Sequence, residues 1–137
     1  MSEAFKFELV SPEAILVSKP VTEVVIPGTV GDFGVLKDHA PILSSIRSGV
    51  VRVSYDDGTK DNIFVKGGFA DVKDNLCTIL AEDAENVDDL NVIELEAFIA
   101  ELEKKRHSNE LDDEEHYIVE QLENTIVKLD ACKVYKF

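Results

Sequence analysis

The sequence lacks several features that many binding and catalytic classes require. It contains no tryptophan, and its two cysteines, Cys77 and Cys132, form neither a CxxC motif nor a metal-ligand spacing. We expect both thiols to be free and buried, in a reducing compartment. No apolar run reaches the ~18 residues of a membrane helix. The opening residues, MSEAFKFELV, lack a basic segment followed by a long apolar one, so we expect no secretory signal.

Positive charge is also scarce. Lysine and arginine number 14 against 28 aspartate and glutamate residues, which gives a net charge of −14. Residues 1–87 hold 14 acidic and 8 basic residues, and residues 88–137 hold 14 and 6. A chain this acidic, without a basic cluster, is not expected to bind a nucleic-acid backbone or an anionic lipid surface.

The first part of the chain has the pattern of a small β domain. Phe5, Phe7 and Leu9 alternate with other residues, as in a half-buried strand. The run Asp56-Asp57-Gly58 lies between two apolar segments and predicts a β-hairpin. Turn signals recur throughout this part, and we expect them to break strands at residues 11–12, 19–20 and 67–68. We predict a β-sandwich or flattened barrel over residues 1–87.

The remaining residues, 88–137, contain no glycine or proline and change to a helical period. Leu90, Ile93, Ala97 and Ala100 follow a rhythm of about 3.6 residues. We expect a cap at residue 88 or 89, a break at residues 108–109, and a second helix that opens at residue 112 or 113. The short connection favours an antiparallel two-helix hairpin. The predicted fold class is therefore mainly β plus α, with a hairpin domain over residues 88–137.

No motif in the sequence carries catalytic chemistry. Asp32-Phe33-Gly34 matches a kinase triplet, but the other kinase motifs are missing. His39 is the one candidate acid–base group with serines nearby in sequence, and none of these serines lies in a nucleophile elbow. No P-loop, zinc site or EF-hand is present, so we predict no cofactor and no metal. The residues alone indicate an interaction protein without visible chemistry. One alternative is an unrelated β-sandwich adaptor with a protein-binding helical hairpin, and a weaker one is a small hydrolase using His39.

The order of segments adds a resemblance to a known family. The run at residues 26–41, IPGTVGDFGVLKDHAP, resembles the signature region of the epsilon subunits of F-type ATP synthases. Residues 7–13, 24–36, 38–43, 48–53, 65–72 and 80–85 resemble successive segments of that family, in the same order. The resemblance is close over residues 1–87 and holds only in outline over the helical hairpin.

The resemblance implies a non-catalytic rotor subunit of the central stalk. Such a subunit binds the gamma subunit and the c-ring, and it couples proton flow to ATP synthesis. The sequence looks similar to bacterial, in particular alphaproteobacterial, members. The expected place is therefore the cytoplasmic face of the bacterial inner membrane, as a peripheral protein held there by its complex.

Two sets of candidate contact residues follow from the resemblance. The set that resembles the c-ring contact is Val30, Gly31, Asp32 and Phe33, and the acid at position 32 suits pairing with a basic ring loop. The set that resembles the gamma contact is His39, Ala40 and Pro41. The alternative for the second set is that these residues only shape the edge of the sandwich.

The helical hairpin departs from the family pattern in two ways. Some members bind ATP through an (I/L)DxxRA motif, but Asn91, Glu94 and Leu95 replace its Asp, Arg and Ala here. Because Glu94 would repel phosphate where arginine attracts it, we predict no ATP binding. The hairpin is also acidic, whereas inhibition of ATP hydrolysis in the family relies on basic helix residues. The alpha and beta subunits are candidate partners of the hairpin, and we expect its inhibitory role to be weak or lost.

Overall fold

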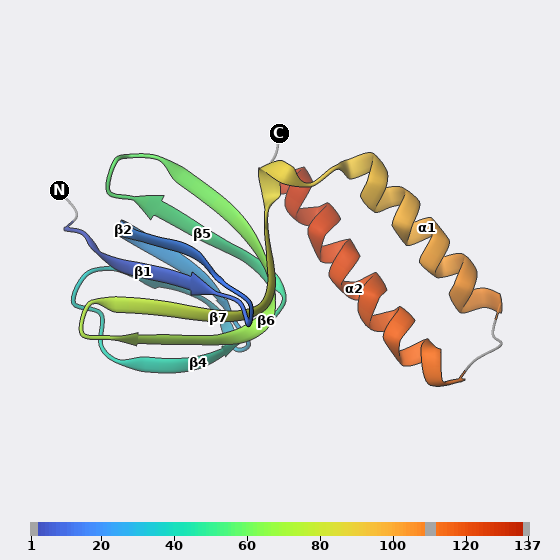
Figure 1. Cartoon of the computed structure of the whole chain (residues 1–137), viewed down its shortest axis with the longest axis horizontal. Coiled ribbons are helices and arrows are strands. Elements are labelled where there is room, and N and C mark those ends of the chain that lie inside the picture. Colours follow the sequence, from blue (N-terminus) through green and yellow to red (C-terminus); the bar gives the residue numbers. More distant parts are fainter. Residues whose placement is uncertain (1–2, 109–111, 136–137) are drawn as a thin grey trace. The chain divides into compact units, whose positions relative to one another are not determined.

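The computed structural model describes residues 3–108 and 112–135. The chain divides into two compact units, Met1–Asn86 and Val87–Phe137. The first unit consists of strands and the second of helices (Figure 1). Across the described ranges, no helix combines the length and the apolar character needed to cross a membrane.

The described part of the first unit, from residue 3 onward, contains seven strands. They are β1 (Phe5–Val10), β2 (Ile15–Gly28), β3 (Gly31–Val35), β4 (Ile42–Ile46), β5 (Gly49–Tyr55), β6 (Lys60–Lys73) and β7 (Leu76–Asn86). Their order is β1-β7-β6-β4-β2-β3, and β5 pairs with both β2 and β6. Among the described residues, β1 pairs with β7 in parallel and the other strand pairings are antiparallel. In the described part of the chain β3 pairs only with β2, so β3 forms an edge of the sandwich, whereas β1 pairs with both β7 and β2.

Two of these strands are longer than the sequence suggested. Strands β2 and β6 each run for 14 residues, so the breaks expected at residues 19–20 and 67–68 are wrong. Pro20 is tolerated because it lies beside an irregularity where the pairing of β2 with β5 shifts. Gly68 keeps β6 continuous because it lets two strands approach closely: a Cβ atom there would lie 1.9 Å from the Leu80 carbonyl oxygen.

The core lies between the inward faces of these strands. Residues along β1 and β5 alternate between buried positions and half-buried or exposed ones. The largest fully buried apolar side chains of this core include Phe7, Leu9, Ile26 and Ile79. Each such side chain contributes about 1.5–3 kcal/mol when it leaves water. This core fixes the outward loops and faces on which the candidate contact residues lie.

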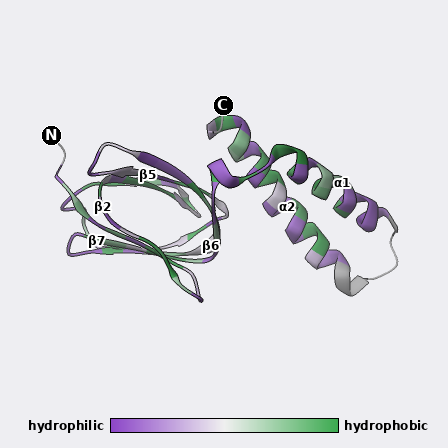
Figure 2. Cartoon of the chain, turned by 45° about the horizontal axis from the view of Figure 1, so that its top comes forward, coloured by the Kyte–Doolittle hydropathy of each residue, from purple (hydrophilic) through white to green (hydrophobic). Residues whose placement is uncertain are grey.

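The second unit contains a 3-10 turn, Val87–Asp89, and two helices, α1 (Val92–Ser108) and α2 (Asp112–Tyr135). The helices run antiparallel and side by side, as predicted (Figures 1 and 2). Leu102, Ile118 and Leu122 form their shared core, with Ile99 against it. The predicted cap at residue 88 or 89 is wrong: Asn91 caps α1 by accepting a hydrogen bond from the Glu94 N–H at 3.1 Å. Residue 109 of the predicted break lies outside the described residues.

Candidate functional site

The first candidate contact set lies on and beside the hairpin tip between β2 and β3. Gly28 pairs with Gly31, so Thr29 and Val30 form a two-residue turn. Val30 is fully exposed, whereas Phe33 is half-buried and packs against the core. A Cβ atom on Gly28 would lie 2.7 Å from the Gly31 carbonyl oxygen, so the tip can close this tightly only around glycine.

Asp32, the acid of this set, already has a partner within the chain. Its Oδ1 atom forms an ion pair with Nη2 of Arg47. Nη1 of the same guanidinium donates a hydrogen bond of 2.6 Å to the Gly28 carbonyl oxygen. Arg47 could not be predicted from the sequence, because it lies 15 positions from Asp32 and no local pattern links the two residues.

The second candidate set follows a turn that a hydrogen-bonded pair holds in place. The Asp38 N–H donates to Oδ1 of Asn75 at 2.7 Å, and Nδ2 of Asn75 donates to Oδ1 of Asp38 at 3.1 Å. Asp38 has a φ of 64°, in the left-handed region that aspartate tolerates better than most residues. Nearby, the hydrogen bond and the charge of Glu3 raise the pKa of Lys37, whose Nζ lies 2.9 Å from Oε2 of Glu3.

His39, Ala40 and Pro41 continue from this turn along the connection to β4. The His39 N–H donates to the Leu36 carbonyl oxygen at 3.2 Å, and Nδ1 of His39 lies 2.6 Å from the Ala40 carbonyl oxygen. Ala40 and Pro41 are exposed and His39 is half-buried. The segment is therefore an ordered, accessible turn that leads into the edge of the sandwich.

The structure does not bring the two candidate sets together. Val30 precedes β3, Gly31, Asp32 and Phe33 open it, and the His39 turn follows its end at Val35. The five residues of β3 therefore lie between Val30 and the His39 turn. A strand of this length spans about 15 Å. The two sets therefore form separate surfaces at opposite ends of one strand.

A third surface, which the sequence analysis did not single out, lies on the outer face of the sheet. Phe69 of β6 pairs with Ser45 of β4 and with Leu80 of β7. Paired residues point to the same face, so Phe69, Leu80 and Leu43 (two residues before Ser45) share it. These three side chains are 54%, 51% and 73% exposed. We call them the apolar sheet face, and exposed apolar patches of this kind mark interaction surfaces.

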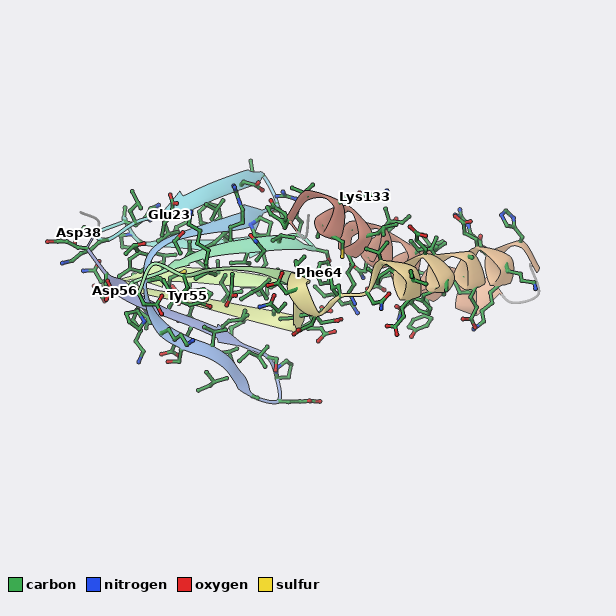
Figure 3. The ribbon with its side chains drawn as sticks, turned by 90° about the horizontal axis from the view of Figure 1, so that it is seen from above. Glu23, Asp38, Tyr55, Asp56, Phe64 and Lys133 are labelled. Atoms are coloured by element: carbon green, nitrogen blue, oxygen red, sulfur yellow. The ribbon has the colours of Figure 1, made fainter. Side chains whose placement is uncertain are left out.

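A polar cluster lies at the end of the core, on β2, β5, β6 and β7. The Tyr55 hydroxyl donates to Oδ2 of Asp61 at 2.8 Å, Asn86 donates to Oδ1 of Asp61 at 3.3 Å, and the Lys19 ammonium lies 5.1 Å from the Tyr55 ring. Burial, followed by the hydrogen bond and the charge of Asp61, raises the pKa of Tyr55, so this hydroxyl stays a neutral donor. The next residue, Asp56, lies at the same end of the sandwich as Asp38 (Figure 3).

Two side chains that were considered for catalysis or for ATP binding form hydrogen bonds elsewhere in the structure. Oγ of Ser44 donates to the Ser45 carbonyl oxygen at 3.0 Å rather than to His39. Asn91, at the Asp position of the ATP-binding motif, uses its side-chain oxygen to cap α1. Across residues 3–108 and 112–135 no group of three or more metal-ligating side chains was found. The two candidate contact sets lie on turns and at strand ends of the sandwich.

The chain is similar to proteins of one known family. Residues 4–87 match the family model described as ATP synthase, Delta/Epsilon chain, beta-sandwich domain. The chain is 47% identical over 133 residues to the ATP synthase epsilon chain of Sinorhizobium medicae, with 94% of this chain and 95% of the relative covered. It is 46% identical over 124 residues to the ATP synthase epsilon chain of Rhizobium etli, and the match covers 88% of this chain and 92% of the relative. It is 43% identical over 135 residues to that of Rhodospirillum centenum, with 95% and 92% covered.

Solved structures show the same fold. A chain in the cryo-EM structure of Euglena gracilis mitochondrial ATP synthase, OSCP/F1/c-ring in rotational state 1, superposes with a TM-score of 0.81 at 23% identity. The match covers 95% of this chain and 81% of that chain. A chain of the Tetrahymena thermophila mitochondrial ATP synthase central stalk and c-ring matches less of the fold, with a TM-score of 0.55 at 13% identity and coverage of 64% and 70%.

Proposed function

This chain belongs to the ATP synthase delta/epsilon chain family, and on that premise we propose that it is a non-catalytic rotor subunit of a proton-translocating F-type ATP synthase. In this role it links the gamma subunit to the c-ring and couples proton flow to ATP synthesis. The observation that carries the proposal is the match to epsilon chains over nearly the whole chain, at 47% identity. That membership sets aside the adaptor unrelated to known families.

The hairpin tip is the surface that we assign to the c-ring. It is narrow and rigid, and it ends in the fully exposed side chain of Val30. Gly31, Asp32 and Phe33 follow on β3, which pairs with β2 and transmits force from the tip into the core. A rigid projection suits a contact that has to pass torque without bending, because energy spent on deforming the contact is lost to the coupled reaction.

The gamma subunit is assigned to the surfaces beyond the far end of β3. His39, Ala40 and Pro41 provide an ordered, accessible turn, and the apolar sheet face adds Leu43, Phe69 and Leu80. Strand β4 starts just after Pro41 and carries Leu43, so the turn and the apolar face are continuous. Burial of apolar area is the main source of affinity in a lasting subunit contact.

The helical hairpin is assigned a weak regulatory role or none. Residues 88–137 carry a net charge of −8, from 14 acidic and 6 basic residues, and they would be repelled by an acidic segment of the beta subunits. The alpha and beta subunits remain candidate partners of this hairpin. The complex would hold the subunit at the cytoplasmic face of the bacterial inner membrane.

The hairpin is also proposed not to bind ATP. Glu94 is exposed and acidic where the motif has arginine, and the Asn91 side-chain oxygen is engaged in the helix cap. Addition of ATP should leave the amide NMR signals of α1 and α2 unchanged. Saturable shifts in residues 90–95 would contradict this assignment.

The overall proposal is tested by depletion and replacement in native membranes. Membranes that lack this subunit should lose ATP-driven proton pumping, and the purified chain should restore it. The tagged chain should also recover the gamma and c subunits when it is isolated from detergent-solubilised membranes. Full pumping without the subunit, or recovery of neither partner, would overturn the proposal.

A further inference from the structure

We propose that Arg47 is a positioning residue that neutralises Asp32 and braces the hairpin tip, so that the tip makes an uncharged contact with the ring through Val30. This inference rests on the proposed function for the identity of the ring. It changes the chemistry of the contact: the partner surface that fits is an uncharged ring loop, instead of a basic loop that pairs with Asp32.

The first observation is the geometry of the Arg47 guanidinium. One nitrogen, Nη2, forms the ion pair with Asp32, and the other, Nη1, donates to the Gly28 carbonyl oxygen at 2.6 Å. Gly28 ends β2 and Asp32 lies near the start of β3. The planar fork of arginine therefore joins the two strands of the hairpin next to their turn, which a lysine ammonium cannot do with the same geometry.

The second observation is that the backbone at the end of β4 and in the β4–β5 turn holds the same tip. The Arg47 N–H donates to the Pro27 carbonyl oxygen at 2.9 Å, and the Thr29 N–H donates to the Ser45 carbonyl oxygen at 3.1 Å. A Cβ atom on Gly49 would lie 3.0 Å from the Pro27 Cβ, so the turn packs closely against β2. The position of Arg47 is therefore fixed by its own backbone.

The third observation is the chemistry of the exposed surface that the hairpin tip offers to a partner. Asp32 is the only ionisable residue from position 28 to position 33, and Arg47 offsets its charge. Val30 is fully exposed, and a Cβ atom on Gly31 would meet nothing within 4 Å, so the peptide at Gly31 is open to a neighbour. The foremost surface of the tip thus consists of the Val30 methyl groups, the exposed side chain of Thr29 with its neutral hydroxyl, and peptide groups. A neutral surface of this kind favours a neutral partner, because burying an unpaired charge against it is unfavourable.

One test uses the isolated full chain and does not depend on the ring. Amide hydrogen exchange at Thr29 should become about three- to tenfold faster in Arg47→Gln, the range expected for losing an exposed ion pair and a hydrogen bond from a charged donor. Arg47→Lys should give a smaller increase. Arg52→Gln, on the neighbouring strand β5, is the matched control and should leave Thr29 unchanged. An unchanged Thr29 in Arg47→Gln would overturn the bracing role.

A second test measures rebinding of F1 that carries each variant to membranes stripped of F1, at low and high salt. Arg47→Gln should weaken rebinding about fivefold, within the range of an exposed charge pair. Asp32→Asn should weaken it less, and the double variant should be no weaker than Arg47→Gln alone. Val30→Ser should weaken rebinding equally at both salt concentrations.

If Asp32 instead paired directly with a basic ring loop, the Arg47→Gln substitution would change the strength of rebinding in the opposite direction. Arg47→Gln would then free the acid and strengthen rebinding at low salt, and Asp32→Asn would be the most damaging change. That result would overturn the uncharged contact. If instead unsubstituted F1 rebinds equally well without this subunit, the proposed function fails, while the exchange result at Thr29 still decides the role of Arg47 within the chain.

Discussion

At the scale of single residues, Gly68 is a position where backbone conformation and packing exclude any side chain. Its φ is 124°, and a Cβ atom would meet the Leu80 carbonyl oxygen at 1.9 Å. Gly68→Ala should therefore lower the free energy of unfolding by roughly 2–4 kcal/mol, from strain plus overpacking. Urea denaturation followed by far-UV circular dichroism measures this loss.

Substitutions at two other glycines distinguish the steric clash at Gly68 from the cost of its positive φ. At Gly34 the atom nearest to an added Cβ would be Oε2 of Glu23 at 3.8 Å, so Gly34→Ala should change stability by less than ~0.5 kcal/mol. Gly58 has a φ of 90° but open space around it, so Gly58→Ala should cost about 1 kcal/mol from the backbone alone. Equal losses in all three variants would contradict the steric explanation for Gly68.

The buried thiol of Cys77 predicts how the free energy of unfolding depends on pH. Burial, and then the charge of Asp71, raise the pKa of its thiol to about 12. Because the folded state holds this proton more tightly than the unfolded state, the stabilisation is complete below about pH 8.5 and is lost as the pH rises toward 12. The free energy of unfolding should thus fall from pH 9 upward, by at most about 1.4 kcal/mol per pH unit.

Denaturation at pH 8, 9 and 10 checks this slope, with Cys77→Ala as the control that should flatten it. Tyr55, whose pKa is also raised, adds a fall of the same sign only above about pH 10. In a Cys132→Ala background the native chain should also resist iodoacetamide at pH 8, because the Cys77 side chain is fully buried. Rapid alkylation without unfolding would contradict the burial of this thiol.

Residue-scale contacts were the least predictable from the sequence. The resemblance named Asp32 as a contact acid, but the ion pair with Arg47 depends on the β4–β5 turn reaching the β2–β3 hairpin. Asn75 likewise holds Asp38 across 37 positions. Periodicity and turn signals report local conformation only, so a pair joined through tertiary structure leaves no local pattern to read.

At the scale of elements, Asn91 decides where α1 begins. Its side chain accepts the Glu94 N–H at 3.1 Å, which satisfies one of the free donors in the first turn. Asn91→Ala should destabilise the helical hairpin by about 1 kcal/mol, seen as faster amide exchange at the start of α1. Asn91→Asp keeps the acceptor and should retain the slow exchange. If Asn91→Ala leaves exchange unchanged, another group must fix the helix start.

Elements were predicted better than contacts, with errors that have physical causes. Alternation in β1 and the helical period in α1 and α2 reflect which face is buried, and both predictions were confirmed. Strand breaks at Pro20 and at residues 67–68 were wrong, since an irregular pairing accommodates the proline and close strand packing requires the glycine. The predicted cap was wrong because Val87–Asp89 forms a 3-10 turn before the helix.

At the scale of the whole molecule, the sandwich holds both proposed rotor contacts. The hairpin tip, the His39 turn and the apolar sheet face all lie within Met1–Asn86, and the core of buried strand residues lies there as well. A chain of residues 1–87 should therefore fold alone, with a cooperative urea transition and the strand signature in circular dichroism. An unfolded fragment would show that the sandwich depends on the residues that follow.

The same truncation tests what the helical hairpin does in the complex. If coupling resides in the sandwich, the 1–87 chain should restore ATP-driven pumping to membranes that lack the subunit. ATP hydrolysis by those membranes should rise less than about twofold relative to the full chain, because repulsion between the acidic hairpin and an acidic beta segment leaves little inhibition to remove. A glutamate-to-glutamine series on the exposed acids of α1 provides the converse control. Inhibition that increases as negative charge is removed would support the electrostatic explanation, whereas strong activation by the truncation would refute it.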